Sequence, residues 1–170
     1  KKSSYFADRV RHLHALLLRE VALQGEGPLG YFKTILEPLA LIAGLSVIRY
    51  ELHPVPPLGP SMAMFFLNGV VVFYAFNKVE SSVSSTFNKN RNLMNFPVLS
   101  VFEMYVSKLI LNVATMFVIY HLFLFGHNFF LKNMFPNQVM WPEDILRVYE
   151  AMLMAGVYGF FVGILNLGIE

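Results

Sequence analysis

Apolar residues gather in long uninterrupted runs along this chain, and most charged residues lie in the segments between those runs. Three stretches, 59–77, 109–131 and 151–169, contain no Asp, Glu, Lys or Arg. A helix needs about 20 such residues to cross the roughly 30 Å hydrocarbon core of a bilayer. The pattern therefore predicts three membrane-spanning helices. Their expected bounds are 60–78, 107–129 and 150–168.

A fourth apolar segment covers residues 31–50, although only 38–48 are free of charged residues. Glu37 and Arg49 border that shorter run, and Lys33 lies one turn before Glu37. Long basic side chains near the ends of a helix can reach the membrane interface. We therefore interpret 31–50 as a fourth span with charged ends. A buried or re-entrant helix is the alternative.

The N-terminal segment, residues 1–24, follows a different pattern. Its apolar side chains recur at steps of three and four, and most of its charged side chains lie off that stripe. Such spacing is typical of an amphipathic helix that lies in the membrane interface. Glycine and proline residues then predict a bend over 21–30. The apolar stripe consists of Phe6, Val10, Leu13, Leu17 and Val21.

Composition agrees with this pattern. Apolar residues make up 56% of the chain and charged residues only 14%, and the mean hydropathy is +0.54, whereas soluble domains carry about 25% charged residues. A soluble globular protein is thus excluded. The prediction is an all-α polytopic membrane protein, with an N-terminal amphipathic interfacial helix and four transmembrane helices in a single transmembrane domain, 1–170.

The distribution of basic residues predicts the orientation in the membrane. If the N-terminus is cytoplasmic, ten of the thirteen Lys and Arg residues lie on the cytoplasmic side, and only Arg49, Lys132 and Arg147 lie outside. Basic residues are enriched in cytoplasmic loops. Both termini and the connection 78–108 are therefore expected in the cytoplasm. The net charge of +2 gives no reason to expect a nucleic acid partner.

Candidate catalytic chemistry is sparse. The chain has no cysteine, and no G-x-x-x-x-G-K-[S/T] phosphate loop occurs. His12 and His14 are two residues apart, so they point to different faces of a helix and make a poor metal pair. We expect neither an enzyme nor a cofactor or metal site. ATP hydrolysis, if the function needs it, would reside in a separate partner.

Polar residues inside the apolar segments are candidates for a gate or for helix packing. Glu37 and Pro38 could shape a gate near the mouth of a span, or simply begin the buried part of the helix. Asn68 and Gly69 favour helix packing, because Asn can bridge helices and Gly lets backbones approach, with a polar pathway as the alternative. His121 favours a hydrogen bond to a neighbouring helix over a proton relay.

Several short motifs carry a family resemblance. They are Leu-Arg-Glu at 18–20, Leu-Gly-Tyr at 29–31, Ile-Leu-Glu-Pro at 35–38, Phe-Phe-Leu-Asn-Gly at 65–69 and Asn-Leu-Met-Asn-Phe at 92–96. With these motifs in this order, the chain resembles the type-2 ABC exporter permeases. It is most similar to the capsule and O-antigen polysaccharide export permeases, and the resemblance covers essentially the whole chain.

The resemblance implies a permease subunit of the bacterial inner membrane that exports a polysaccharide or lipid-linked glycan. It also implies two kinds of partner, an ABC-type ATPase subunit and a second permease copy. The amphipathic helix and the inner loop would contact the ATPase, which makes Arg19, Glu20, Lys89 and Arg91 the candidate coupling residues.

The number of spans generates a second hypothesis. Permeases of this family have six spans, and this chain contains the first four, as either a fragment or a shortened relative. A shortened relative could act as a structural accessory subunit of a larger respiratory or photosynthetic membrane complex, in contact with lipid and with other membrane subunits.

Overall fold

The computed structural model describes residues 2–24, 28–52, 55, 57, 61–86, 101–134, 142 and 144–166. Within these ranges the chain is helical and contains no strand, which confirms the predicted all-α class. The helices are α1 (Lys2–Gln24), α2 (Pro28–Leu52), α3 (Met62–Ser84), α5 (Val101–Met134) and α6 (Ile145–Asn166).

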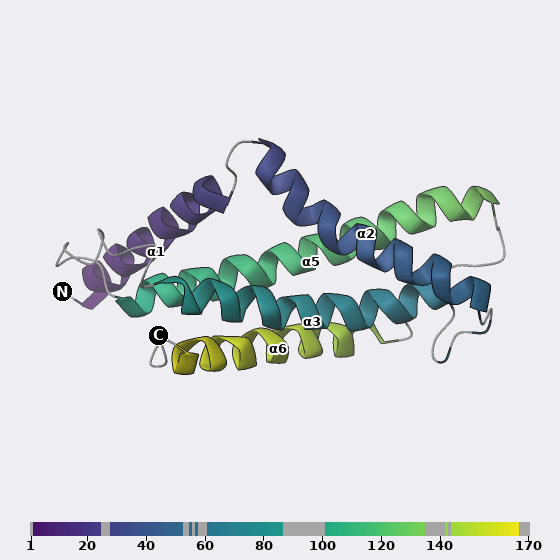
Figure 1. The fold of residues 1–170 in the computed structure, drawn as a ribbon. Helices are drawn as coiled ribbons and strands as arrows, with labels where there is room; N and C mark the ends of the chain where they lie inside the picture. The colour runs from purple at the N-terminus through teal and green to yellow at the C-terminus, as the bar shows by residue number, and fades with distance from the viewer. Residues whose placement is uncertain are drawn as a thin grey trace.

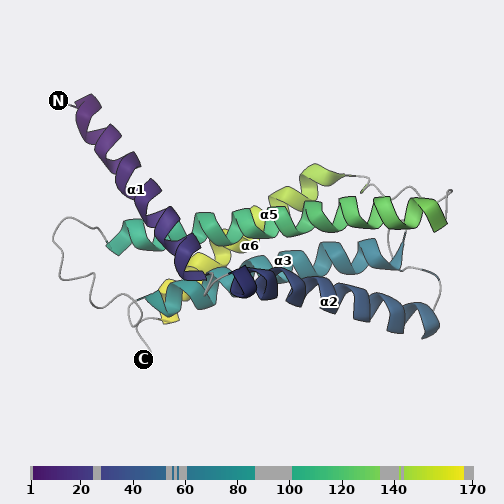
Figure 2. The ribbon, with the colours of Figure 1, turned by 90° about the horizontal axis from the view of Figure 1, so that it is seen from above.

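Helix α3 is the centre of the bundle. It packs against α6, α5 and α2, whereas α1 packs on α5 and extends away from the other helices (Figures 1 and 2). The start of α1 and the end of α6 lie toward the same end of the bundle (Figure 1). Helices α3 and α5 run in opposite directions, so the end of α3 and the start of α5 also lie at that end.

Among the described residues, three helices are long and apolar enough to cross a membrane. They are Met62–Ser84, Phe102–Phe129 and Ile145–Asn166, and they overlap three of the four predicted spans. Helix α2 covers the fourth predicted segment and is not among these three. Its assignment as a span stays a prediction.

Local sequence explains where two of the helices begin. Ser61 caps α3, because its Oγ accepts a hydrogen bond from the backbone N–H of Met64 at 3.2 Å. Helix α2 begins at Pro28, since proline suits the first turn of a helix. The predicted bend over 21–30 is therefore too long, because α1 continues to Gln24 and 28–30 already belong to α2.

The apolar core lies between α3, α5 and α6. Leu67 and Val71 of α3 are fully buried against Ile119 of α5 and Met152 of α6. From α2, only Pro38 and Ile42 are buried among the side chains that the structure describes. Helix α2 therefore buries fewer of its described residues than α3, α5 or α6.

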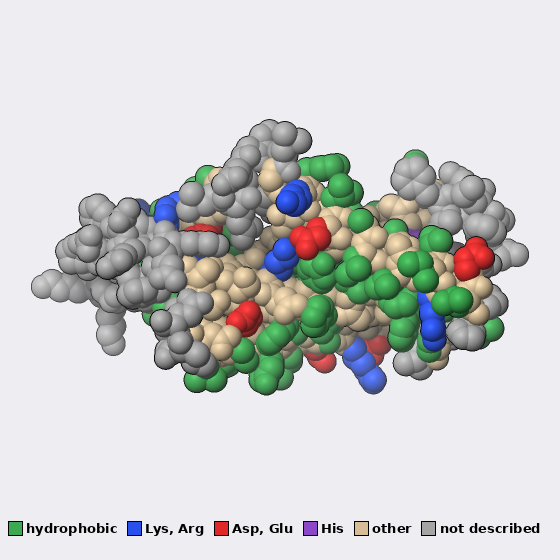
Figure 3. Space-filling model, viewed as in Figure 1, with side chains coloured by type: hydrophobic (Ala, Val, Ile, Leu, Met, Phe, Trp, Pro, Cys, Tyr) green, Lys and Arg blue, Asp and Glu red, His purple; other side chains and the backbone are tan. Residues whose placement is uncertain are grey.

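The outward faces of the bundle are also apolar. Figure 3 shows hydrophobic side chains spread over one face, with isolated charges between them. Val118 and Phe125 of α5 are 58% and 64% exposed, and Phe161 of α6 is 59% exposed. Apolar helices with such outward side chains suit a hydrocarbon environment better than water.

Glycines on α6 allow its backbone to approach α3 closely. A Cβ atom at Gly159 would lie 2.5 Å from the carbonyl oxygen of Phe76, and one at Gly163 would lie 2.8 Å from that of Glu80. Real Cβ atoms do not come so near, so these positions accept only glycine at this helix separation.

Gly69 does not have the packing role that its position next to Asn68 suggested. A Cβ atom there would meet nothing within 4 Å, and the residue is exposed. The reason is helical geometry, because Gly69 lies on the opposite side of α3 from the buried Leu67 and Val71. Within the part of the chain that the structure describes, Gly69 therefore does not bring two backbones together.

These two glycines provide a matched test of the packing. Gly159→Ala should lower the free energy of unfolding by about 1–3 kcal/mol, because the added methyl group forces α6 away from α3. Gly69→Ala should leave it unchanged or raise it by up to about 1 kcal/mol through helix propensity. Thermal unfolding of the detergent-purified proteins measures both. Equal effects of the two substitutions would contradict the close approach of α3 and α6.

Candidate functional site

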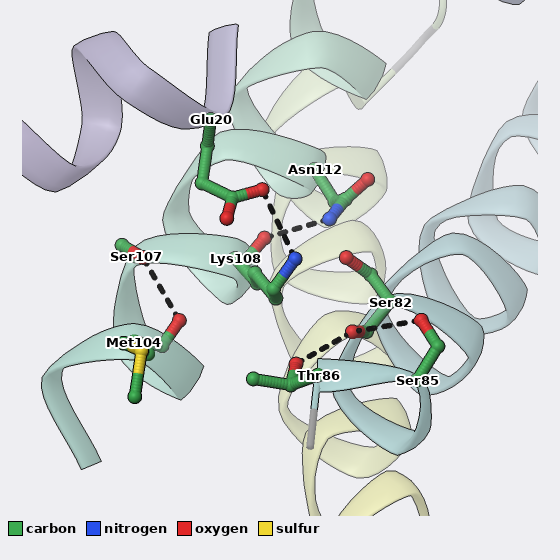
Figure 4. A network of polar contacts seen from close by, with 8 residues as sticks. All are labelled: Glu20, Ser82, Ser85, Thr86, Met104, Ser107, Lys108 and Asn112. Carbon is green, nitrogen blue, oxygen red and sulfur yellow. Dashed lines mark hydrogen bonds and ion pairs between the residues drawn. The ribbon is translucent and has the colours of Figure 1, made fainter. Parts of the chain in front are cut away.

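A buried ion pair joins α1 to the bundle. Nζ of Lys108 on α5 lies 3.0 Å from Oε2 of Glu20 on α1, and the two side chains are only 6% and 8% exposed (Figure 4). Glu20 follows Leu16 by one turn, so both lie on the face of α1 that is buried. The pair therefore lies in the contact between α1 and α5.

The polar groups near Lys108 are satisfied within their own helices. The side-chain amide of Asn112 donates to the carbonyl oxygen of Lys108 at 2.8 Å, and the Ser107 hydroxyl donates to that of Met104 at 2.8 Å. Figure 4 shows these groups beside the last turn of α3, where Thr86 donates to the carbonyl oxygen of Ser82. Glu20 supplies the charge that balances Lys108.

Glu20 was predicted as a residue that meets an ATPase, but its carboxylate is engaged inside the chain. A buried charge that loses its partner is costly, so this contact holds α1 in one place on α5. Sequence reasoning missed Lys108 as the partner. The sequence did indicate a polar helix face at this place, because its residues recur at steps of four and three. They are Lys108, Asn112 and Thr115, and the structure buries all three.

A second ion pair joins α2 to α3. Nζ of Lys78 lies 3.3 Å from Oε2 of Glu37, and these side chains are 34% and 50% exposed. The Tyr74 hydroxyl, one turn before Lys78, donates to Oε1 of Glu37 at a longer 3.5 Å. Pro38 is buried directly after Glu37. The pair is weaker than the buried one, because solvent and headgroups can reach it.

The polar residues within the spans bridge helices. Asn68 accepts a hydrogen bond from the Tyr120 hydroxyl at 3.3 Å, which links α3 to α5 and agrees with its interpretation as a packing residue. The Tyr149 hydroxyl of α6 lies 2.8 Å from Nε2 of His121 on α5. This confirms that His121 bonds to a neighbouring helix.

The second ring nitrogen of His121 determines how that hydrogen bond runs. Its Nδ1 lies 2.8 Å from the carbonyl oxygen of Phe117, which can only accept a hydrogen bond. Nδ1 is therefore the donor of this contact, and Nε2 makes the contact with the Tyr149 hydroxyl. Both nitrogens are engaged in packing in this arrangement.

The structure gives less detail on the other predicted coupling residues. Arg19 is half-buried next to Glu20, and Lys89 and Arg91 lie outside the described residues. Among the residues that are described, no group of three or more His, Cys, Asp or Glu side chains is placed to hold a metal ion.

The fold and these contacts define a helical membrane protein whose helices are joined by polar pairs. Two curated sequences of the polysialic acid transport protein KpsM from Escherichia coli are each 26% identical to it over 141 residues, which is 79% of this chain and 54% of the relative. The chain thus spans about half the length of the curated relatives it matches, and the relationship is distant. No family model and no solved structure matches.

The buried pair can be tested by a double-mutant cycle. Glu20→Met or Lys108→Met alone should lower the free energy of unfolding by about 3–5 kcal/mol, because each leaves a buried charge without its partner. Glu20→Met together with Lys108→Met should recover most of the loss. Glu37→Gln, in the exposed pair, is the control and should cost about 1 kcal/mol or less. Additive losses in the double variant would contradict a direct interaction.

Proposed function

We propose that this protein is a permease subunit of an ABC-type exporter that carries a polysaccharide or lipid-linked glycan across the bacterial inner membrane. The observation that carries the proposal is the alignment with a polysialic acid transport protein over 79% of this chain. The all-helical architecture with three helices apolar enough to span a membrane supports it.

An exporter of this kind needs energy from a partner. The sequence contains no phosphate loop, so the proposal includes a separate ABC-class ATPase and a second permease copy. The ATPase would act on the helical bundle through cytoplasmic contacts. Arg19 of α1 and the basic residues Lys89 and Arg91 remain the candidates for those contacts.

The ion pair of α1 suggests how such a contact reaches the membrane. Helix α1 extends from the bundle (Figure 2) and is fixed to α5 by the buried Glu20–Lys108 pair. A displacement of α1 by the ATPase would therefore move α5 with it. In this proposal Glu20 passes the displacement of α1 on to α5 and does not itself contact the ATPase.

Orientation is part of the proposal. We place the N-terminus in the cytoplasm, because this arrangement puts ten of the thirteen basic residues inside. The start of α1, the end of α3 and the end of α6 share one end of the bundle (Figure 1), which would then face the cytoplasm.

Charge reversal at each end of the bundle tests which end contacts the ATPase. Lys89→Glu with Arg91→Glu should reduce surface export at least tenfold and lower co-purification with the ATPase, while membrane insertion stays intact. Lys132→Glu with Arg147→Glu makes the same change in charge at the opposite end, and should leave both readouts unchanged. Surface polysaccharide and a pull-down of the ATPase are measured in cells that lack the native copy.

Three outcomes would count against the proposal. Equal effects of the two double variants would remove the coupling role of Lys89 and Arg91. Normal surface polysaccharide in cells without the protein would contradict an export function. Stable co-purification with a respiratory or photosynthetic complex, and with no ABC-class ATPase, would favour the structural alternative.

A further inference from the structure

Two lysines flank one carboxylate on the surface between α2 and α3. Lys33 precedes Glu37 by one turn of α2, so the two side chains lie on the same side of the helix. Glu37 in turn pairs with Lys78 of α3 at 3.3 Å. The cluster of Lys33, Glu37 and Lys78 has a net charge of +1.

We propose that this cluster binds the phosphodiester headgroup of an anionic membrane lipid. Lys33 is exposed and makes no hydrogen bond or ion pair with any residue that the structure describes. An ammonium group on an apolar protein surface favours an anionic partner. A phosphodiester shares one negative charge between two non-bridging oxygens, so it could accept from Lys33 and Lys78 together.

The position of the cluster along the helices suits a headgroup. Lys78 directly follows the uncharged run 59–77, and Glu37 directly precedes the uncharged run 38–48. The charges therefore lie where the apolar layer begins, which is the depth at which basic side chains meet lipid phosphates.

Exposed apolar side chains next to the cluster suit the rest of the lipid. Phe32 and Leu36 of α2 are 61% and 48% exposed, and Phe73 of α3 is 60% exposed. Phe32 and Leu36 directly precede Lys33 and Glu37 in the sequence, and Phe73 directly precedes Tyr74, whose hydroxyl donates to Glu37. Acyl chains of a bound lipid would cover this apolar surface, which favours a lipid over a water-soluble phosphate.

The existing ion pair does not block the site. Glu37 and Lys78 are half-exposed, and pairs of this kind contribute little to stability, so Lys78 can exchange Glu37 for a phosphate at low cost. The buried Glu20–Lys108 pair has no such freedom. The inference depends on these contacts alone and holds whether or not the protein is an exporter.

Lipid titration by native mass spectrometry tests the site on the whole protein in non-ionic detergent. The probes are phosphatidylglycerol, which is anionic, and phosphatidylcholine, which is zwitterionic. The first phosphatidylglycerol should bind more tightly than phosphatidylcholine. Lys33→Gln and Lys78→Gln should each weaken its binding about five-fold. Glu37→Gln should strengthen it, because the substitution removes a repulsive charge and releases Lys78.

Arg49→Gln is the matched control, since Arg49 is an exposed basic residue of the same helix that lies outside the cluster. It should leave the affinity of the first phosphatidylglycerol unchanged. Equal weakening by Arg49→Gln would overturn the proposal in favour of non-specific attraction. Weakened binding in Glu37→Gln, with unchanged thermal unfolding, would also overturn it, because the carboxylate would then belong to the site as an attractive group.

Discussion

Polar side chains inside an apolar bundle must find partners, either within their own helix or on another, and contacts of the second kind join the helices of this protein. An unpaired charge or hydrogen-bonding group is costly where water is scarce. In the described part of the chain, five helix pairs are each linked by a polar side-chain contact. The contacts are Glu20–Lys108 (α1–α5), Glu37–Lys78 (α2–α3), Asn68–Tyr120 (α3–α5), His121–Tyr149 (α5–α6) and Glu80–Asn166 (α3–α6).

These contacts differ in how firmly they hold. The buried Glu20–Lys108 pair fixes α1 to α5, whereas the exposed Glu37–Lys78 pair holds α2 loosely and leaves its charges open to lipid. Glycines on α6 bring the backbones of α3 and α6 close together. One exposed and one buried ion pair join the N-terminal helices to the rest of the bundle.

The sequence predicted the helices well and their contacts poorly. Long uncharged runs identify spans because bilayer thickness sets their length, and a polar His121 within such a run correctly indicated a helix contact. The partner of Glu20 depends on how α1 folds back onto α5, which no local pattern specifies. Gly69 faces no other helix in the described part of the chain, and the sequence does not show which side of α3 is covered. The spacing of Gly159 and Gly163 indicates a close helix contact, but it does not identify α3 as the neighbour.

The position of α1 on α5 is the central claim, and a distance between the two helices tests it most directly. The chain has no native cysteine, so spin labels at Ala15→Cys and Ile110→Cys, both exposed positions, report on α1 and α5 alone. Pulsed electron paramagnetic resonance in lipid nanodiscs should give one narrow distance distribution for the otherwise native chain. Lys108→Gln should broaden it and shift it to longer distances. A narrow, unshifted distribution in the Lys108→Gln variant would contradict the account.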